Sequence, residues 1–301
     1  MSKKIQAHLA LLIANLVYGG SFFIAKTVMP EFLSPNVFIL LRVTGATLLF
    51  WTLRVFLKEK IERKDLGLMA ICGVFGVALN QLLFFQGLSQ TSPVDAAIIM
   101  VSSPVIVILL SFFILKTKIT INKVLGISLG LAGAAMLIYL SGNESDKLSS
   151  FKGNLFVFAN AVSYSLYLVI VKPLMKKYQP LTVLSYVFLF GLIFVIPFGI
   201  TDLNELNQVF PFEVLLAIGF VILFTTFVTY LFNIFAVKHL SPTITSSYIY
   251  LQPVFAMVIG FVVHLFGNDL YYHSITWEKI VCTLFIFLGV FLTSISFDRK
   301  V

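Results

Sequence analysis

Aromatic and polar side chains recur inside long apolar segments of this sequence, where a membrane would leave them without water. Tyr18 and Tyr164 lie near the centres of two such segments, and Pro104 and Pro253 near the centres of two others. A proline removes a backbone donor and bends a helix, which frees a polar carbonyl group. Polar groups in a bilayer are costly unless they face a partner or a cavity, so the pattern indicates a binding site for a small molecule.

The residues that we expect to bind this molecule are Tyr18, Asn80, Gln81, Ser103, Pro104, Tyr164, Tyr167, Tyr230, Tyr248, Gln252 and Pro253. Rings mixed with neutral amides suit a small zwitterion or a polar neutral metabolite better than a strong anion. A structural interpretation stands beside this one, because prolines also shape helix packing. Ser and Thr hydroxyls in apolar helices also bond to their own backbone or to neighbouring helices.

Three charges, Lys26, Arg42 and Asp95, fall near one end of their apolar segments. The positions that correspond to Arg42 and Asp95 in the second half of the chain are apolar, Phe188 and Ile244. We expect a gate on the outer side of the membrane in which Asp95 pairs with Arg42 or Lys26. The alternative is snorkelling, in which a long charged side chain such as that of Lys26 reaches the lipid headgroups.

The composition decides the class of protein that must position these groups. Of 301 residues, 59% are apolar and only 11% are charged, and the mean hydropathy is +1.01. A soluble domain carries about a quarter charged residues, so these values indicate an integral membrane protein. The net charge of +8 does not indicate a nucleic-acid partner, because the basic residues lie in short connections between apolar segments. The two cysteines lie inside apolar segments and predict no disulfide framework.

A helix needs about 20 apolar residues to cross a bilayer, and ten segments meet this length. The first is too long for the apolar part of a signal peptide, so we expect it to remain as a span. The fold class that follows is an all-α integral membrane protein embedded in the lipid bilayer. The predicted spans are 7–28, 37–57, 66–87, 94–115, 122–141, 153–174, 181–200, 213–236, 243–266 and 279–297.

The distribution of Lys and Arg predicts the orientation. Of the 21 Lys and Arg residues, Lys26 and Arg42 lie within spans. With a cytoplasmic N-terminus, only Lys147, Lys152 and Lys279 lie outside, and the other sixteen lie inside. Cytoplasmic connections of membrane proteins are rich in Lys and Arg. We therefore expect a multi-pass protein of the cell membrane with both termini in the cytoplasm.

Two halves of the chain repeat one another. A shift of 149 residues places Ser92-Pro93 on Ser241-Pro242 and Pro104 on Pro253, and a shift of 146 places Tyr18 on Tyr164 and Lys26 on Lys172. A unit of five spans is odd, so its second copy must cross the membrane in the opposite direction. We expect two inverted five-helix repeats, 1–141 and 153–301, joined by a linker at 142–152. Such repeats are common in secondary transporters, although a duplication can also simply enlarge a bundle.

With this repeat, the chain resembles the drug/metabolite transporter superfamily, and specifically its ten-span EamA-type carriers. The resemblance covers about 7–140 and 153–297 and implies transport of a metabolite, often outward. Gln252 stands where a Glu often precedes the proline, and Tyr18 where Trp is common. The residues that carry the resemblance are Tyr18-Gly19-Gly20-Ser21-Phe22, Lys26, Leu41-Arg42, Ser92-Pro93, Ser103-Pro104-Val105 and Leu251-Gln252-Pro253-Val254-Phe255.

The sequence thus predicts a secondary transporter, expected to be an exporter, of a small polar metabolite such as an amino acid or a derivative, working by alternating access. We predict no enzymatic activity and no cofactor or metal, because no zinc or phosphate-binding motif is recognised. An intramembrane enzyme or a lipid scramblase on the same scaffold is the alternative. Since Gln252 is not titratable, protons as a coupling ion and facilitated exchange stay open, as do a monomer and a homodimer.

Overall fold

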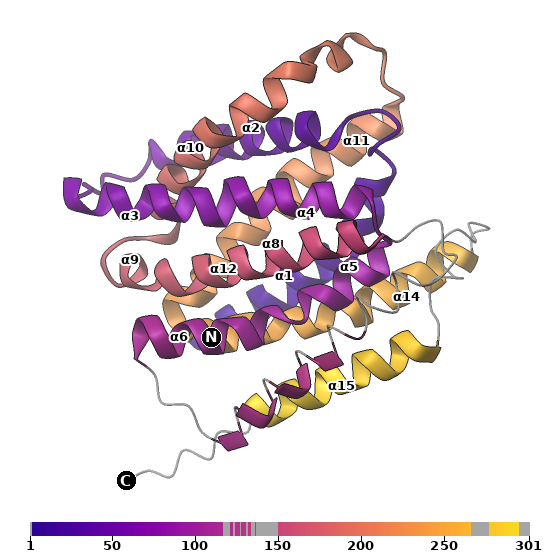
Figure 1. Cartoon of the computed structure of the whole chain (residues 1–301). Coiled ribbons are helices and arrows are strands. Elements are labelled where there is room, and N and C mark those ends of the chain that lie inside the picture. Colours follow the sequence, from indigo (N-terminus) through magenta and orange to yellow (C-terminus); the bar gives the residue numbers. More distant parts are fainter. Residues whose placement is uncertain are drawn as a thin grey trace.

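The structure is a computed structural model that describes residues 2–116, 150–265 and 277–294, with scattered residues between 121 and 136. All regular secondary structure in these described ranges is helical (Figure 1). Eight helical segments there are long and apolar enough to cross a membrane. The protein is therefore an all-helical, multi-pass membrane protein. About half of the predicted fifth span at 122–141 and most of the predicted linker at 142–152 lie outside the described residues, as does the segment 295–301.

The first half contributes four of the membrane-spanning segments, each close to its predicted range. The third segment contains a short π-helix, η1, and the fourth is divided after Met100. The elements are α1 (Lys3–Lys26), α2 (Pro35–Arg54), α3 (Arg63–Gly73), η1 (Val74–Ala78), α4 (Leu79–Ser89), α5 (Pro93–Met100) and α6 (Ser103–Leu115).

The second half repeats this order. Its third segment contains a π-helix, η3, its fourth contains a 3₁₀ turn, η4, and α15 falls on the predicted tenth span. The elements are α8 (Phe151–Ile170), α9 (Lys172–Lys177), α10 (Pro180–Gly199), η2 (Ile200–Asn207), α11 (Phe212–Phe220), η3 (Val221–Val228), α12 (Thr229–His239), α13 (Pro242–Ser247), η4 (Tyr248–Tyr250), α14 (Leu251–Leu265) and α15 (Trp277–Ser294).

The repeated Ser-Pro pairs are helix starts. The hydroxyl of Ser92 accepts a hydrogen bond from the backbone N–H of Asp95 at 3.0 Å, and that of Ser241 accepts one from Ile244 at 3.2 Å. A proline occupies the first turn of each helix, where its missing N–H costs nothing. The shift of 149 residues carries Asp95 to Ile244, so the same cap begins α5 and α13.

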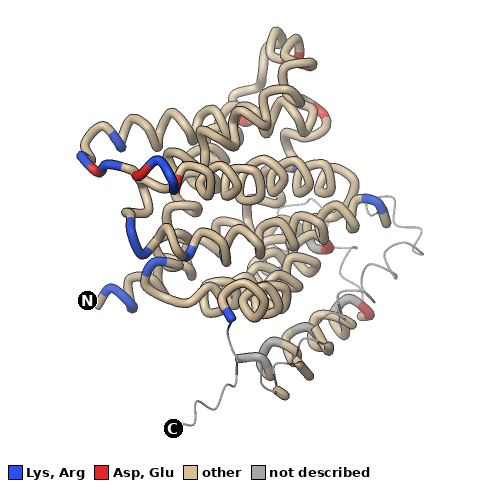
Figure 2. Tube along the Cα trace, turned by 60° about the vertical axis from the view of Figure 1, so that its left-hand side comes forward, with Lys and Arg blue, Asp and Glu red and all other residues tan. Residues whose placement is uncertain are grey.

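The two halves cross the bundle in opposite directions. At the end of α1, the Lys26 ammonium donates to the carbonyl of Ser89 at 3.4 Å, and the N–H of Ser150 donates to the neighbouring carbonyl of Gln90 at 3.0 Å. The start of α8 therefore lies where α1 ends. Figure 2 shows most Lys and Arg residues at the other end, beside the N-terminus. We call this the basic end, and the end that contains Lys26 the opposite end.

The close contacts between the halves follow a pseudo-two-fold pattern. A Cβ atom on Gly45 would lie 2.7 Å from Cγ2 of Ile222, and one on Gly191 would lie 3.1 Å from the backbone oxygen of Gly73. The shifts of 146 and 149 residues carry Gly45 to Gly191 and Gly73 to Ile222. The same shifts relate α4 to α12 and α1 to α8. Accordingly, α4 packs on α8 and α12 packs on α1. The described parts of the two halves are thus related by an approximate half-turn.

Candidate functional site

A cavity lies between the two halves near the middle of the bundle. Six of the residues predicted to bind substrate border it, and Arg42, predicted as part of a gate, borders it too. These residues are Tyr18, Asn80, Gln81, Tyr164, Tyr230 and Gln252. The remaining wall comes from Asn15, Ser21, Phe22, Ala25, Phe84, Phe85, Met100, Asn160, Val221, Thr225, Asn233 and Ile249.

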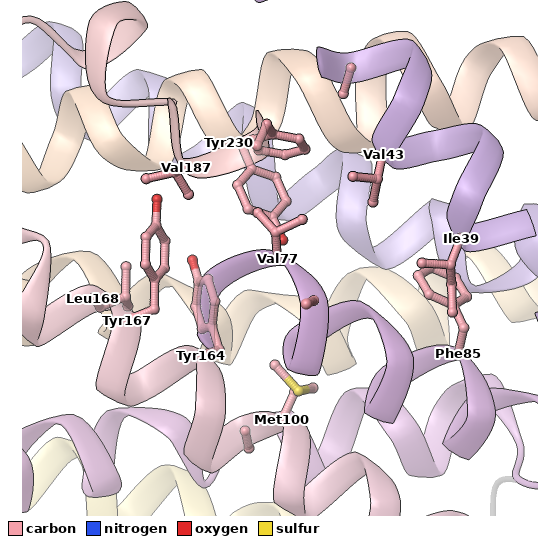
Figure 3. Packing of buried hydrophobic residues seen from close by; sticks show 14 of the residues in the cluster. Ile39, Val43, Val77, Phe85, Met100, Tyr164, Tyr167, Leu168, Val187 and Tyr230 are labelled. Carbon is pink, nitrogen blue, oxygen red and sulfur yellow. The ribbon is translucent and has the colours of Figure 1, made fainter. Parts of the chain in front are cut away.

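The cavity extends from mid-depth toward the opposite end of the bundle. On α1, which runs away from the basic end, it is bordered from Asn15 to Ala25. On the basic side of Tyr164 lies Tyr167, which is 1% exposed and packs against Gly76 of η1. Figure 3 shows Tyr164 and Tyr167 pointing the same way from α8, toward the helix that carries Val187. The ring of Tyr167 therefore occupies space between the cavity and the basic end.

The hydroxyl of Tyr230 joins the halves at the pseudo-two-fold axis. It lies 2.9 Å from both the carbonyl oxygen of Gly76 and Oδ1 of Asn80, and its one proton is donated to one of them. Its oxygen accepts from Nε2 of Gln81 at 3.4 Å. Gln81 and Tyr230 are 149 residues apart, and equivalent residues can touch only near the axis that relates them. The axis therefore runs through the cavity wall.

Amide side chains form further bridges around the cavity. Nε2 of Gln252 donates to Oδ1 of Asn15 at 2.8 Å. Nδ2 of Asn160 donates to the backbone oxygen of Asn80 at 2.6 Å, and Nδ2 of Asn233 donates to the Tyr18 hydroxyl at 3.3 Å. Each bond connects the first half of the chain to the second. Buried polar groups that are bonded in this way fix a defined wall geometry.

Arg42 places a guanidinium group in the cavity wall. Its side chain is 3% exposed, and its Nε and Nη2 atoms donate to the Thr226 hydroxyl at 3.0 and 2.9 Å. The guanidinium carbon lies 4.2 Å from the centre of the Phe85 ring, a cation–π contact. The cavity thus combines aromatic rings, neutral amides and one cation.

Lys26 and Lys172 have equivalent contacts with the ends of other helices. The Lys26 ammonium donates to the Ser89 carbonyl at the end of α4, and the Lys172 ammonium donates to the carbonyls of Val237 and Leu240 at the end of α12. Cations stabilise helix C-termini, where carbonyl groups lack helical partners. This contact accounts for the repeated lysine. Asp95 lies fully buried in the first turn of α5, and its pairing with Lys26 or Arg42 in a gate stays a prediction.

Five of the residues predicted to bind substrate lie outside the cavity wall. Pro104 and Pro253 lie in the first turns of α6 and α14, just beyond the breaks in their spans. The backbone oxygen of Ser103 accepts from the Ser165 hydroxyl at 3.0 Å, and Tyr248 bonds Nδ1 of His8 at 2.7 Å near the basic end. The fifth is Tyr167. These residues shape or close the bundle around the cavity.

The sequence reasoning missed the apolar part of the wall. Phe84 and Phe85 border the cavity from the same helix as Asn80 and Gln81. Phe85 follows Gln81 by four residues, and side chains at this spacing share a helix face. That spacing predicts that Phe85 borders the same cavity as Gln81.

A cluster of hydrogen bonds connects the two halves at the basic end. The Asp65 carboxylate accepts from the Lys177 ammonium at 2.9 and 3.0 Å and from the Tyr178 hydroxyl at 2.7 Å. Burial and the adjacent carboxylate raise the pKa of Tyr178, so its hydroxyl keeps its proton and donates at neutral pH. We call Asp65, Lys177 and Tyr178 the basic-end cluster.

Comparison with known proteins decides the family. The model of the EamA-like transporter family matches residues 5–139 and 151–295. The chain belongs to the EamA-like transporter family. The two matches fall on the two halves that the fold relates by a half-turn, which agrees with the predicted repeat.

Several relatives of this EamA-family chain carry transporter names. It is 29% identical over 266 residues to the uncharacterized transporter YyaM of Bacillus subtilis, covering 87% of each chain. An uncharacterized transporter of Archaeoglobus fulgidus is 26% identical over 282 residues, or 94% of this chain and 96% of the relative. A probable terminal-alkyne amino-acid exporter of Streptantibioticus cattleyicolor is 25% identical over 199 residues, or 66% of this chain and 65% of the relative. A solved crystal structure with 16% identity matches the fold over 96% of each chain with a TM-score of 0.66.

Proposed function

We propose that this EamA-family protein is a secondary transporter that exports a small polar metabolite, such as an amino acid or a derivative, by alternating access. It works in the cell membrane with the basic end and both termini in the cytoplasm. The observation that carries this proposal is a polar cavity at mid-depth, on the axis that relates two inverted halves. Inverted repeats favour two arrangements of similar energy, each open to one side.

The pseudo-symmetry identifies the residues that border the cavity in the second arrangement. The shift of 149 residues relates Val221 and Thr225, which border the cavity, to Cys72 and Gly76. The shift of 146 relates Ser21, also in the wall, to Tyr167. When the halves exchange conformations, Cys72, Gly76 and Tyr167 take the places of these residues on the basic side. The cavity then opens toward the cytoplasm.

The wall chemistry supports a small polar substrate. Six amide side chains and three tyrosines border the cavity beside phenylalanine rings. A wall that offers both polar and apolar groups suits a metabolite that carries both. The named amino-acid exporter among the relatives supports the same class and the outward direction.

Counterflow into liposomes tests this proposal. Liposomes with the purified protein are loaded with unlabelled amino acids, and uptake of labelled amino acids is followed. We expect uptake above protein-free liposomes, and we expect Ser21→Trp, which fills the cavity, to abolish it. Gly67→Trp is the matched control, because nothing lies within 4 Å of a Cβ atom at Gly67.

Two results would contradict the proposal. One is uptake by the wild type no faster than in protein-free liposomes for every metabolite tested. The other is equal uptake by the Ser21→Trp and Gly67→Trp proteins. Movement of a fluorescent lipid between leaflets without solute uptake would favour the scramblase alternative.

An imposed pH gradient distinguishes the two coupling modes. Under proton antiport, a gradient alone drives net substrate movement. Under facilitated exchange, movement requires substrate on the far side whatever the gradient. The neutral amides at Asn15 and Gln252, which bond each other in the wall, favour exchange.

A further inference from the structure

Four polar atoms at the cavity lack hydrogen-bond partners among the described residues. They are Nη1 of Arg42, Oε1 of Gln81, Oδ1 of Asn160 and Oγ1 of Thr225. Their residues are 3%, 2%, 1% and 4% exposed, and all four border the cavity. Buried polar groups are nearly always bonded, so four orphaned atoms on one cavity indicate groups that a ligand satisfies.

The other bonds of these side chains fix which atom is free. Nδ2 of Asn160 donates to the Asn80 carbonyl, an oxygen that can only accept, so its free atom is the amide oxygen. The Tyr230 hydroxyl uses its single proton on Gly76 or Asn80, so it accepts from Nε2 of Gln81. The free atom of Gln81 is therefore also an oxygen. The cavity thus presents one cationic donor, two amide acceptors and the Thr225 hydroxyl, which can donate or accept.

The surroundings of Arg42 leave its charge to be compensated. Its two bonded nitrogens share one neutral hydroxyl, that of Thr226, and its guanidinium lies over the Phe85 ring. A buried charge is costly unless it is paired and fully hydrogen-bonded. A carboxylate suits a guanidinium best, because the two groups form parallel, charge-assisted hydrogen bonds.

We propose that Arg42 binds the carboxylate of the substrate, while the amide oxygens of Gln81 and Asn160 accept hydrogen bonds from its ammonium group. This inference rests on the proposed function and specifies its substrate as a zwitterionic amino acid. Arg42 thereby acts as a binding residue of the cavity rather than only as part of a gate.

The spacing of the two subsites suits such a molecule. Phe85, which lies under the Arg42 guanidinium, and Gln81 are four residues apart on α4, so their Cβ atoms are about 5–6 Å apart. Asn160 bonds the backbone next to Gln81, which brings its oxygen to the same subsite. The rings of Tyr18, Tyr164 and Phe84 complete the wall and are available to the substrate's side chain.

Thermal unfolding of the purified, detergent-solubilised protein tests the proposal, because a ligand that binds the folded state raises the unfolding temperature. The probes are the standard L-amino acids, each with its carboxamide, its decarboxylated amine and its deaminated acid. We expect at least one amino acid to stabilise the protein, and its carboxamide and amine to bind about 10- to 100-fold more weakly. The deaminated acid should lose affinity to a smaller degree.

Substitutions of Arg42 test whether this residue causes the preference for the carboxylate over the carboxamide. We expect Arg42→Gln to bind the amino acid about 10- to 100-fold more weakly and to bind acid and carboxamide alike. Arg42→Lys, which keeps the charge without the planar fork, should retain the preference for the acid at reduced affinity. Arg54→Gln is the matched control, because Arg54 also bonds a threonine hydroxyl, that of Thr182, and lies over the ring of Tyr186, outside the cavity.

Several outcomes would overturn this inference while leaving the transporter proposal intact. One is stabilisation by, and counterflow of, neutral metabolites but no amino acid. Another is equal binding of an amino acid and its carboxamide to the wild type. If Arg42→Gln does not elute as a folded monodisperse protein, Arg42→Lys and the wild-type ligand series decide alone. Counterflow that is absent for every solute contradicts the proposed function itself.

Discussion

Gly76→Ala should open the basic side of the cavity. A Cβ atom on Gly76 would lie 2.5 Å from Cδ2 of Tyr167, whereas non-bonded carbon atoms rest about 3.5–4.0 Å apart. The ring must therefore move by about 1 Å or more in a site where it is 1% exposed. Overpacking of this kind costs about 1–3 kcal/mol. This strain is present only in the arrangement that is closed at the basic end. Destabilising that arrangement by this amount raises the fraction of molecules open at the basic end about 5- to 150-fold.

The native Cys72 reports this opening. It is fully buried here, and the pseudo-symmetry relates it to Val221 of the cavity wall, so we expect it to reach water when the basic side opens. The assay is the rate of alkylation by a small maleimide, with Cys282 replaced by Ala. The rate should rise in Gly76→Ala by the factor above and stay unchanged in Gly67→Ala, whose added methyl meets nothing within 4 Å.

A companion variant keeps this reasoning testable if Gly76→Ala folds poorly. Tyr167→Ser removes the ring and places at 167 the residue type found at the equivalent position, Ser21. It should therefore also speed the alkylation of Cys72. A folded Gly76→Ala protein whose Cys72 reacts at the wild-type rate would refute the role assigned to Tyr167.

Two further predictions concern charged contacts near the basic end, one within the second half and one between the halves. Lys172→Met should lower the free energy of unfolding by about 1 kcal/mol, because it removes a cation from the end of α12. Lys176→Met, at an exposed position, is the control and should leave the free energy of unfolding unchanged. Unfolding temperatures of the two variants test both expectations. An unchanged unfolding temperature in Lys172→Met would contradict this assignment. Asp65→Asn, which loses the charged bonds to Lys177, should raise Cys72 alkylation a few-fold by weakening closure at the basic end. Glu62→Gln, whose ion pair is exposed, should leave the rate unchanged, and equal rates in the two variants would oppose a closing role.

Much of the fold followed from local chemistry in the sequence. Ser92-Pro93 and Ser241-Pro242 carry a capping hydroxyl and a proline suited to a first turn, and both pairs begin helices. The span lengths follow from the thickness of the bilayer, and the repeat follows from paired residues such as Lys26 and Lys172. The family match over both halves and the all-helical structure confirm the predicted class.

The details of the site depend on contacts between distant segments. Arg42 was predicted as a gate charge, but its place in the cavity wall results from how α2 packs on η3, where Thr226 receives its bonds. The π-helices η1 and η3 also shift the faces that their spans present, and no pattern in the sequence predicted them. Tyr167 lies only three residues from Tyr164 on the same helix, so sequence position alone did not distinguish the cavity wall from its closure.

Labelling of two equivalent residues in sealed vesicles tests alternating access most directly. One protein carries the native Cys72 alone, and the other carries Val221→Cys with both native cysteines replaced by Ala. A membrane-impermeant maleimide is added to one side at a time. We expect Cys72 to react only from the side of the basic end and the cysteine at 221 only from the other, with Gly76→Ala raising the first rate and lowering the second. Reaction of both from the same side, or two rates that rise together, would contradict the exchange of the halves.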